Sequence, residues 1–119
     1  MTRAKDAVGA YGERVAVRFL IAQGMHILER NWRGARGEID IIAADGDVIV
    51  FCEVKTRRTE SFGTPSDALV PAKVRRLRRL AAQWLAARGL RPGPVRFDVV
   101  SIWPRSSGPA DVDHLRGAF

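Results

Sequence analysis

The sequence predicts one α/β domain over residues 1–119, in which a helix precedes three strands and a second helix precedes a last strand. Two stretches, one near the N-terminus and one in the second half of the chain, repeat apolar residues at helical spacing. Between them, apolar and polar residues alternate around an Asp-Gly pair that favours a hairpin. With 119 residues, of which 46% are hydrophobic, the chain is long enough to bury a core.

The first helix is expected from about residue 6 to 23, with Gly24 as its stop. Five apolar residues recur at helical spacing and form its core stripe: Val8, Tyr11, Val15, Phe19 and Ala22. Glu13 falls beside this stripe, next to Ala16 and Leu20, and not on the opposite side. An acidic side chain is thus expected close to the packed face of this helix.

Three strands, a second helix and a last strand should follow. Their expected ranges are Met25–Arg30, Gly37–Ala43, Asp47–Thr56, 71–88 and Val95–Trp103, with a polar turn over 31–36 and a loop over 57–65. The second helix begins with Pro71, which suits a first turn, and ends at Gly89. Its expected core stripe consists of Val74, Leu77, Ala81, Trp84 and Leu85.

The Asp-Gly pair at 45–46 sets the expected register of the hairpin. A two-residue loop at these positions, both with positive φ, pairs Asp40 with Phe51 and Glu38 with Glu53. Asp40 and Glu53 then become diagonal neighbours, roughly 7–8 Å apart at Cα. Directly opposed glutamates repel each other, and a cation between the carboxylates would remove this conflict.

Alternation divides the second hairpin strand between two faces. One face carries Val48, Val50, Cys52 and Val54, and the other carries Ile49, Phe51, Glu53 and Lys55. Asp40 joins the charged face. Two interpretations stay open for these charges: they form a solvated face of an antiparallel sheet, or they hold a divalent metal beside a nucleophilic water.

The chain is basic, with 20 Lys and Arg against 13 Asp and Glu and a formal charge of +7. No acid occurs between Asp67 and Asp98, and five of the seven residues from Lys73 to Arg79 are basic. Such a patch attracts polyphosphates with a steep dependence on salt, whereas the competing interpretation is a solvated, arginine-rich helix face. The residues expected to contact nucleic acid are Lys73, Arg75, Arg76 and Arg79.

Several kinds of site and compartment are not expected. Cys52 is the only cysteine, so the chain forms no internal disulfide and suits a reducing cytosol. The sequence shows neither a signal peptide nor an apolar run that could span a bilayer, so a cytoplasmic protein is expected. His26 and His114 do not complete a zinc site with one cysteine and are expected at the surface. Trp32, in the arginine-rich turn, is the tryptophan best placed to stack on a base.

Short motifs recur in a fixed order along the chain. They are Gly12-Glu13, Asn31 with Arg33, Gly37-Glu38-Ile39-Asp40, Glu53-Val54-Lys55-Thr56-Arg57, Phe62-Gly63 with Pro65, Lys73, Arg96-Phe97-Asp98-Val99-Val100 and Ala118-Phe119. In this order and spacing they resemble the YraN family of small bacterial endonuclease-like proteins. The resemblance covers nearly the whole chain and implies a restriction-endonuclease-like fold. That fold has an αβββαβ core, a mixed central sheet flanked by helices, and is similar to that of Holliday-junction resolvases.

The resemblance also implies roles for the charged residues. Asp40 and Glu53 would bind Mg²⁺ or Mn²⁺, with the Val54 carbonyl as a third oxygen, and Mg²⁺ commonly takes only one or two protein carboxylates. Lys55 would orient the attacking water or neutralise the charge that develops on the phosphate. Glu13 would bind the metal directly or through water.

Further residues of the motifs have secondary roles. Lys73 would contact the scissile phosphate or another phosphate of the backbone. Arg33 and Arg57 are expected to contact nucleic acid as well. Glu38 shares the charged face with the catalytic candidates, and a structural salt bridge with an arginine is the alternative for it.

These observations predict a metal-dependent nuclease that acts on nucleic acid, with DNA favoured over RNA and branched structures among its substrates. The first alternative is a non-catalytic nucleic-acid-binding protein that keeps the fold, and the second is an interaction module that recruits an acidic protein. Intact Asp40, Glu53 and Lys55 favour catalysis over the first alternative. The acid-free stretch of the chain favours nucleic acid over the second. Whether two copies form a homodimer stays open.

Overall fold

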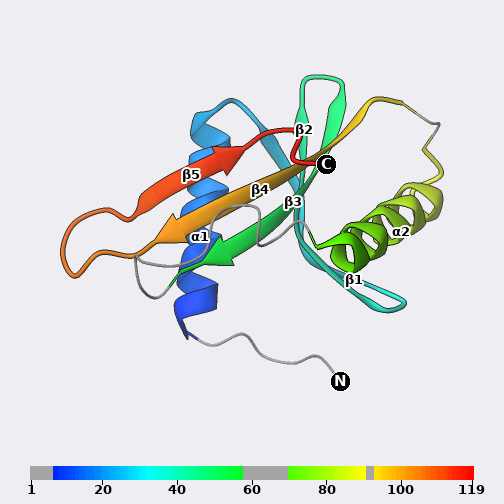
Figure 1. Cartoon of the computed structure of the whole chain (residues 1–119). Coiled ribbons are helices and arrows are strands. Elements are labelled where there is room, and N and C mark those ends of the chain that lie inside the picture. Colours follow the sequence, from blue (N-terminus) through cyan, green and yellow to red (C-terminus); the bar gives the residue numbers. More distant parts are fainter. Residues whose placement is uncertain (1–6, 58–69, 91–92) are drawn as a thin grey trace.

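The computed structural model describes residues 7–57, 70–90 and 93–119, and it contains a five-stranded sheet with a helix on each face (Figure 1). In chain order the elements are α1 (Ala7–Ala22), β1 (His26–Gly34), β2 (Gly37–Asp45), β3 (Val48–Thr56), α2 (Pro71–Ala87), β4 (Val95–Trp103) and β5 (Asp111–Leu115). The predicted order is confirmed, and β5 extends it. The loop expected after Arg57, with its Phe62-Gly63 motif, lies outside the described residues.

The sheet is mixed, as the fold class requires. Its strand order is β1-β2-β3-β4-β5, in which β3 and β4 run parallel and the other neighbouring pairs run antiparallel. A parallel pair needs a long crossover connection, and the segment that contains α2 provides it. No helix in the described parts of the chain is long and apolar enough to cross a membrane.

β1 runs further than the sequence pattern predicts. It continues to Gly34, through most of the segment 31–36 that was expected as a turn. Asn31 takes a left-handed φ of 53°, and the pairing with β2 shifts register between Ile27 and Glu29. These two irregularities let a polar stretch stay in the ladder.

β5 is the strand that the sequence pattern does not predict. Val112 and His114 are half-buried and alternate with three exposed residues, so the apolar signal is weak. The strand is held by its pairing with β4, in which Val112 lies opposite Ile102 and His114 opposite Val100. Its order therefore depends on a tertiary contact.

The β2–β3 hairpin closes one residue later than its Asp-Gly pair suggests. Asp45 pairs with Val48, so the two-residue loop is Gly46-Asp47. Gly46 has a φ of 62°, whereas Asp47 does not have a positive φ. A turn with glycine at its first central position needs a positive φ only at that glycine. Asp45 therefore stays in the extended strand and does not adopt a left-handed conformation.

The observed register corrects two predicted pairs. Phe51 lies opposite Ile42 and not opposite Asp40, and the predicted opposition of Glu38 and Glu53 is also wrong. A shift of two residues leaves every side chain on its own face. The predicted division of β3 into an apolar face and a charged face therefore survives the correction.

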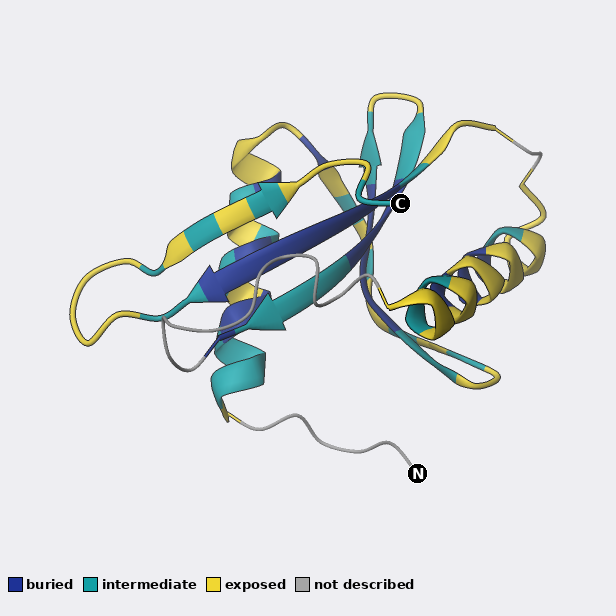
Figure 2. Ribbon diagram, in the orientation of Figure 1, coloured by how far each residue is buried: buried dark blue, intermediate teal, exposed yellow. Residues whose placement is uncertain are grey.

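Two hydrophobic clusters lie on opposite faces of the sheet, whose central strands are buried (Figure 2). The cluster under α1 includes Leu20, Ile41, Val50, Cys52 and Val100. The cluster under α2 includes Ile42, Phe51, Leu77, Trp84 and Phe97. β2 and β3 supply residues to both clusters, which explains why their apolar runs are nearly continuous. The predicted stripe of α2 is confirmed at Leu77, Ala81 and Trp84, and Leu80 adds to it.

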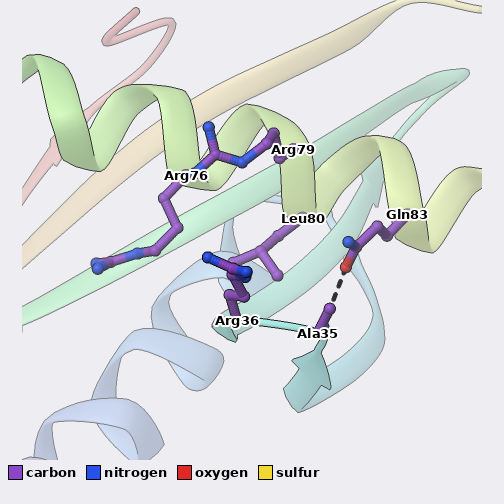
Figure 3. Close-up of a pocket in the computed structure, with 6 residues that line it drawn as sticks. All are labelled: Ala35, Arg36, Arg76, Arg79, Leu80 and Gln83. Carbon is purple, nitrogen blue, oxygen red and sulfur yellow. Dashed lines mark hydrogen bonds between the residues drawn. The ribbon is translucent and has the colours of Figure 1, made fainter.

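The turn between β1 and β2 packs directly against α2 (Figure 3). The Ala35 N–H donates to Gln83 Oε1 over 3.1 Å. A Cβ on Gly34 would lie 2.5 Å from Leu80 Cδ2, and one on Gly37, whose φ is 148°, would lie 3.4 Å from Leu80 Cδ1. Glycine on both sides of the turn therefore permits the close contact with the helix.

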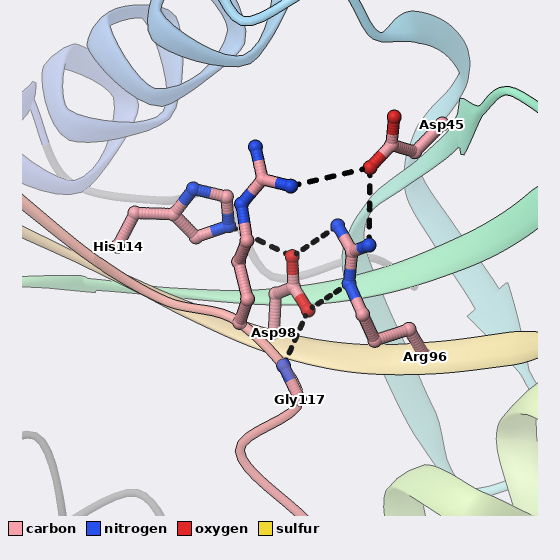
Figure 4. Close-up of polar contacts among 6 residues, drawn as sticks. Asp45, Arg96, Asp98, His114 and Gly117 are labelled. Carbon is pink, nitrogen blue, oxygen red and sulfur yellow. Dashed lines mark hydrogen bonds and ion pairs between the residues drawn. The ribbon is translucent and has the colours of Figure 1, made fainter.

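Asp98 on β4 is fully buried and accepts hydrogen bonds from several directions (Figure 4). Arg96 donates from Nε over 2.9 Å and from Nη2 over 3.1 Å, and the Gly117 N–H donates over 3.0 Å. His114 Nε2 lies 2.7 Å from Asp98 Oδ2, and Arg96 also donates to Asp45 over 3.0 Å. This polar network ties β5 and the C-terminal segment to the β2–β3 turn.

The environment of Asp98 changes its acidity. Burial alone would raise the pKa of Asp98, but hydrogen bonds from His114, Arg96 and the Gly117 N–H outweigh it and lower the pKa to about 2. His114 itself has a side chain that is only 7% exposed. The prediction of a surface histidine is therefore wrong for His114, while His26 is exposed as expected.

Asp98→Asn should lower the free energy of unfolding at pH 7 by about 3–5 kcal/mol, because a buried ion pair loses one partner. The pKa of Asp98 is about 2 in the folded chain and 3.8 as its ordinary value. The carboxylate therefore contributes its full stabilisation above pH 3.8, and this stabilisation is lost as the pH falls from 3.8 toward 2. The difference in stability between wild type and variant should therefore shrink as the pH falls from 4 to 2, as measured by urea unfolding. A difference that stays constant over this interval contradicts the assignment. Asp113→Asn, at an exposed position of β5, is the control and should change little.

Candidate functional site

The sheet forks where β2 and β3 stop pairing. Their ladder ends with Ile41 opposite Cys52. Before Ile41, β2 is paired with β1 as far as Gly34 opposite Gly37, whereas β3 continues beside β4 as far as Thr56. Figure 1 shows the end of the β1–β2 hairpin close to α2, while β3 runs on next to β4. At this fork the β1–β2 pair and the β3–β4 pair separate, and residues of both pairs line the point of separation.

Asp40 lies at the fork, and its side chain replaces a backbone acceptor. Asp40 Oδ2 accepts a hydrogen bond from the Val54 N–H over 2.8 Å, and the residue is 8% exposed. The carboxylate thus satisfies an N–H of β3 at the point where the β2 backbone turns away. The Val54 N–H follows Glu53 directly along β3, so this hydrogen bond brings the Asp40 carboxylate to the strand segment that carries Glu53.

Glu53 connects the fork to the start of α2. Its carboxylate forms an ion pair with Lys73, and the two side chains are 12% and 24% exposed. Lys73 stands in the first turn of the helix, where the helix dipole disfavours a cation and where no acid of α2 compensates it. Glu53 therefore supplies the missing negative charge from the sheet.

Lys55 shares the face of Glu53, because the two residues are two positions apart on one strand. Lys55 is half-buried, and its neighbour in the parallel ladder is Ser101 on β4. The predicted group Asp40, Glu53 and Lys55 thus lies on the fork and the β3 segment that follows it.

Glu13 approaches the same end of β3 from α1. Its neighbour Gly12 packs on Thr56 so closely that a Cβ would lie 1.8 Å from Thr56 Oγ1, which only glycine avoids. Glu13 is 4% exposed. α1 covers the face of the sheet opposite to α2, and the role of Glu13 as a metal ligand stays a prediction.

Asp40, Glu53 and the Val54 carbonyl offer oxygen donors, the kind that Mg²⁺ and Mn²⁺ prefer. No three His, Cys, Asp or Glu side chains in the described ranges are grouped as ligands of one ion. The predicted donors at the fork itself are two carboxylates and a carbonyl, and Glu13 stays a predicted further ligand. Since Mg²⁺ keeps several waters and commonly takes one or two protein carboxylates, these residues are compatible with it in kind and number.

The arginines predicted on α2 are in the expected environment. Arg75, Arg76 and Arg79 are exposed and lie off the buried stripe of the helix. Arg36, which the sequence pattern does not single out, lines a hollow together with Arg76 and Arg79. The contact of the β1–β2 turn with α2 brings it there, and the surrounding basic turn is the only sequence signal that points to it.

The two arginines of the family motifs differ from each other. Arg33 is exposed on β1 and lies directly across the ladder from Glu38. Opposite charges therefore face each other, which agrees with the alternative interpretation of Glu38 as the partner of an arginine in a structural salt bridge. Arg57 is 8% exposed, and its guanidinium lies 5.9 Å from the centre of the Trp103 ring. Trp32 is half-buried against the cluster under α2. Among these residues, Arg33 is the one open to solvent.

Cys52 is confirmed as a packed residue of the core, with 1% exposure. Burial first, and then the negative charges of Asp98, Asp40 and Glu53, raise the pKa of the Cys52 thiol far above its ordinary value. A thiol that resists ionisation is a poor nucleophile.

Asp40→Asn and Asp40→Ala should separate the need for an acceptor from the need for a charge. Asparagine keeps an oxygen for the Val54 N–H, so its free energy of unfolding should stay within about 1 kcal/mol of wild type. Alanine leaves this N–H without its acceptor, so the free energy of unfolding of Asp40→Ala should be lower than that of Asp40→Asn by about 1–3 kcal/mol. Denaturant unfolding at neutral pH measures both, and equal stability of the two variants would rule out the acceptor role.

Comparisons with known proteins place the chain among close relatives. The family model described as "Uncharacterised protein family UPF0102" matches residues 12–102. A UPF0102 protein of Kineococcus radiotolerans is 58% identical over 116 residues, which are 97% of this chain and 95% of the relative. A UPF0102 protein of Beutenbergia cavernae is 54% identical over 115 residues, which are 97% and 98% of the two chains. The solved structure of Pyrococcus furiosus SfsA in complex with Ca²⁺ aligns with 92% of this chain and 62% of its own, at 12% identity and a TM-score of 0.39, a likeness too weak to bear on function.

Proposed function

This chain belongs to the uncharacterised protein family UPF0102, which confirms its resemblance to the YraN family, and we propose that it is a metal-dependent nuclease. The proposed reaction is hydrolysis of a phosphodiester bond in nucleic acid, with DNA favoured over RNA and Mg²⁺ or Mn²⁺ as the ion. The observation that supports this proposal is the hydrogen bond from the Val54 N–H to Asp40, which brings the Asp40 carboxylate to the segment of β3 that carries Glu53 and Lys55.

Each side chain has its own role in the proposed reaction. The Val54 N–H fixes one oxygen of Asp40 and thereby orients the carboxylate. Glu53 would hold the ion from the other branch of the fork. The ion, when bound, would acidify a water molecule and offset charge on the phosphate. Lys55 would orient that water or neutralise the charge that develops on the phosphate.

Lys73 would respond to the substrate. Its ammonium compensates Glu53 in the structure, and its flexible four-carbon stem allows it to exchange one anionic partner for another. A phosphate at the fork offers such a partner. The arginines that follow Lys73 on α2 would hold the rest of the backbone.

A non-catalytic nucleic-acid-binding protein is the second candidate, and the ion pair between Glu53 and Lys73 favours it. That pair compensates the acid within the chain, so Glu53 has a structural explanation without any ion. The two candidates share the basic face of α2. They differ in whether Asp40, Glu53 and Lys55 are needed for cleavage.

Calorimetric titration with Mn²⁺ should detect a site in the wild type that is lost in Asp40→Asn and in Glu53→Gln. Lys73→Gln should keep the site and bind Mn²⁺ at least as tightly, because the competing ammonium is gone. Thermal unfolding without added metal verifies that each variant is folded. Equal Mn²⁺ binding by the wild type and both carboxylate variants would exclude the proposed site.

Lys55→Met should lower the cleavage rate by about 10²–10³, the usual cost of one preorganised donor, and leave nucleic-acid affinity almost unchanged. The substrate for this comparison comes from a screen of duplex, flap, four-way junction and single-stranded DNA, and matched RNA, with Mg²⁺ or Mn²⁺. Arg18→Met removes the same charge from the exposed side of α1 and should alter neither quantity. If the wild type cleaves nothing, or if Lys55→Met cleaves equally well, the non-catalytic binder becomes the better account.

A further inference from the structure

A hollow of about 320 Å³ lies between the β1–β2 turn and α2 (Figure 3). Its lining consists of Ala35, Arg36, Arg76, Arg79, Leu80 and Gln83. The lining residues are thus three arginines, a glutamine, a leucine and an alanine, and none of them is acidic. This composition suits an anion that has several acceptor oxygens.

The backbone around the hollow holds the turn in place. The hydrogen bond from the Ala35 N–H to Gln83 Oε1 fixes the turn on the helix, and Gln83 keeps its amide nitrogen as a donor. Gly37 follows Arg36 directly, and a Cβ there would lie 3.5 Å from Arg76 Cδ. Glycine at this position therefore lets Arg36 and Arg76 approach one region from two separate elements.

The positive charge in the hollow is not compensated within the described ranges. There, none of the guanidinium groups of Arg36, Arg76 and Arg79 pairs with a carboxylate, whereas Arg88 and Arg96 do have carboxylate partners. Arg76 and Arg79 are one helical turn apart and repel each other. A phosphate would relieve this repulsion, and the planar guanidinium group matches its oxygens in bidentate geometry.

We propose that this hollow binds a backbone phosphate of the nucleic acid at a fixed distance from the bond that is cut, an inference that rests on the proposed nuclease function. Lys73, at the acidic fork, and Arg79 are six residues apart on α2, which is roughly 9 Å at ~1.5 Å per residue. The bound phosphate is therefore a near neighbour of the scissile one on the same strand, and not the scissile phosphate itself.

Such a contact would set the register of the strand. Binding energy from a part of the substrate that does not react can position the bond that does react. A mononucleotide cannot reach both the fork and the hollow. The hollow therefore favours a strand that carries phosphates beyond the scissile one, and it contributes nothing to the hydrolysis of a phosphodiester that is too short to reach it.

Arg36→Gln tests this assignment, because Arg36 lies on a different element from the basic helix. Fluorescence anisotropy with labelled DNA should show binding weakened about five- to tenfold at ~0.1 M salt, and a plot of log affinity against log salt whose slope is smaller by about one. Arg18→Gln is the matched control for charge, since Arg18 is exposed on α1 across the sheet, and it should have little effect. Equal losses in the two variants would overturn the phosphate site.

A strand in which one phosphate at a time is replaced by a neutral methylphosphonate locates the contact. One replacement should weaken binding to the wild type and not to Arg36→Gln, and in a cleaved substrate it should lie at one fixed position relative to the cut, other than the scissile phosphate. If the wild type cleaves but no replacement depends on Arg36, the phosphate site fails and the nuclease proposal stands. If one replacement depends on Arg36 but the wild type cleaves nothing, the phosphate site stands, although its relation to a cut and the nuclease proposal both fail.

Discussion

The fork between β2 and β3 is the constraint on which the rest of the structure depends. A ladder that ran on in register would join the two strands edge to edge along their whole length. Here β2 leaves β3 beyond the pair of Ile41 and Cys52, and Asp40 satisfies the Val54 N–H that would otherwise lose its acceptor. The departing β1–β2 hairpin then reaches α2 with its turn. One separation thus creates both the acidic group at the fork and the basic hollow beside the helix.

Two acids of the structure show how differently a carboxylate can be held. Asp98 accepts hydrogen bonds from Arg96, His114 and the Gly117 N–H, which leave its oxygens no room for another partner and hold its pKa at about 2. Glu53 instead pairs with Lys73, a single ammonium on a flexible chain. A carboxylate that is saturated by fixed donors stabilises the fold, whereas one that is held by an exchangeable cation can take an ion or release its partner to a phosphate. The motif around Asp98 is therefore architectural, and the proposed chemistry is assigned to the fork.

The sequence predicts which face a side chain occupies better than it predicts which residue lies opposite. Period-two alternation places Glu53 and Lys55 on one face whatever the turn does, and a register error of two residues does not change that face. The error itself arises because the Asp45-Gly46 pair suits two alternative turns, and local chemistry does not choose between them. β5 is not predicted from the sequence, because its order comes from pairing with β4 and not from its own residues.

In the candidate site, too, the sequence predicts the kind of side chain better than it predicts the contacts that the side chain makes. Charge density along the chain identifies the arginines of α2, but it cannot identify Arg36, which lies far from them in sequence. Arg36 joins them because Gly34 and Gly37 let the turn touch the helix, a contact that exists only in the folded chain. Arg57 shows the converse, because it belongs to a family motif and is nevertheless buried beside Trp103. What an arginine packs against, more than the charge of its neighbours in sequence, therefore decides whether it is available to a phosphate.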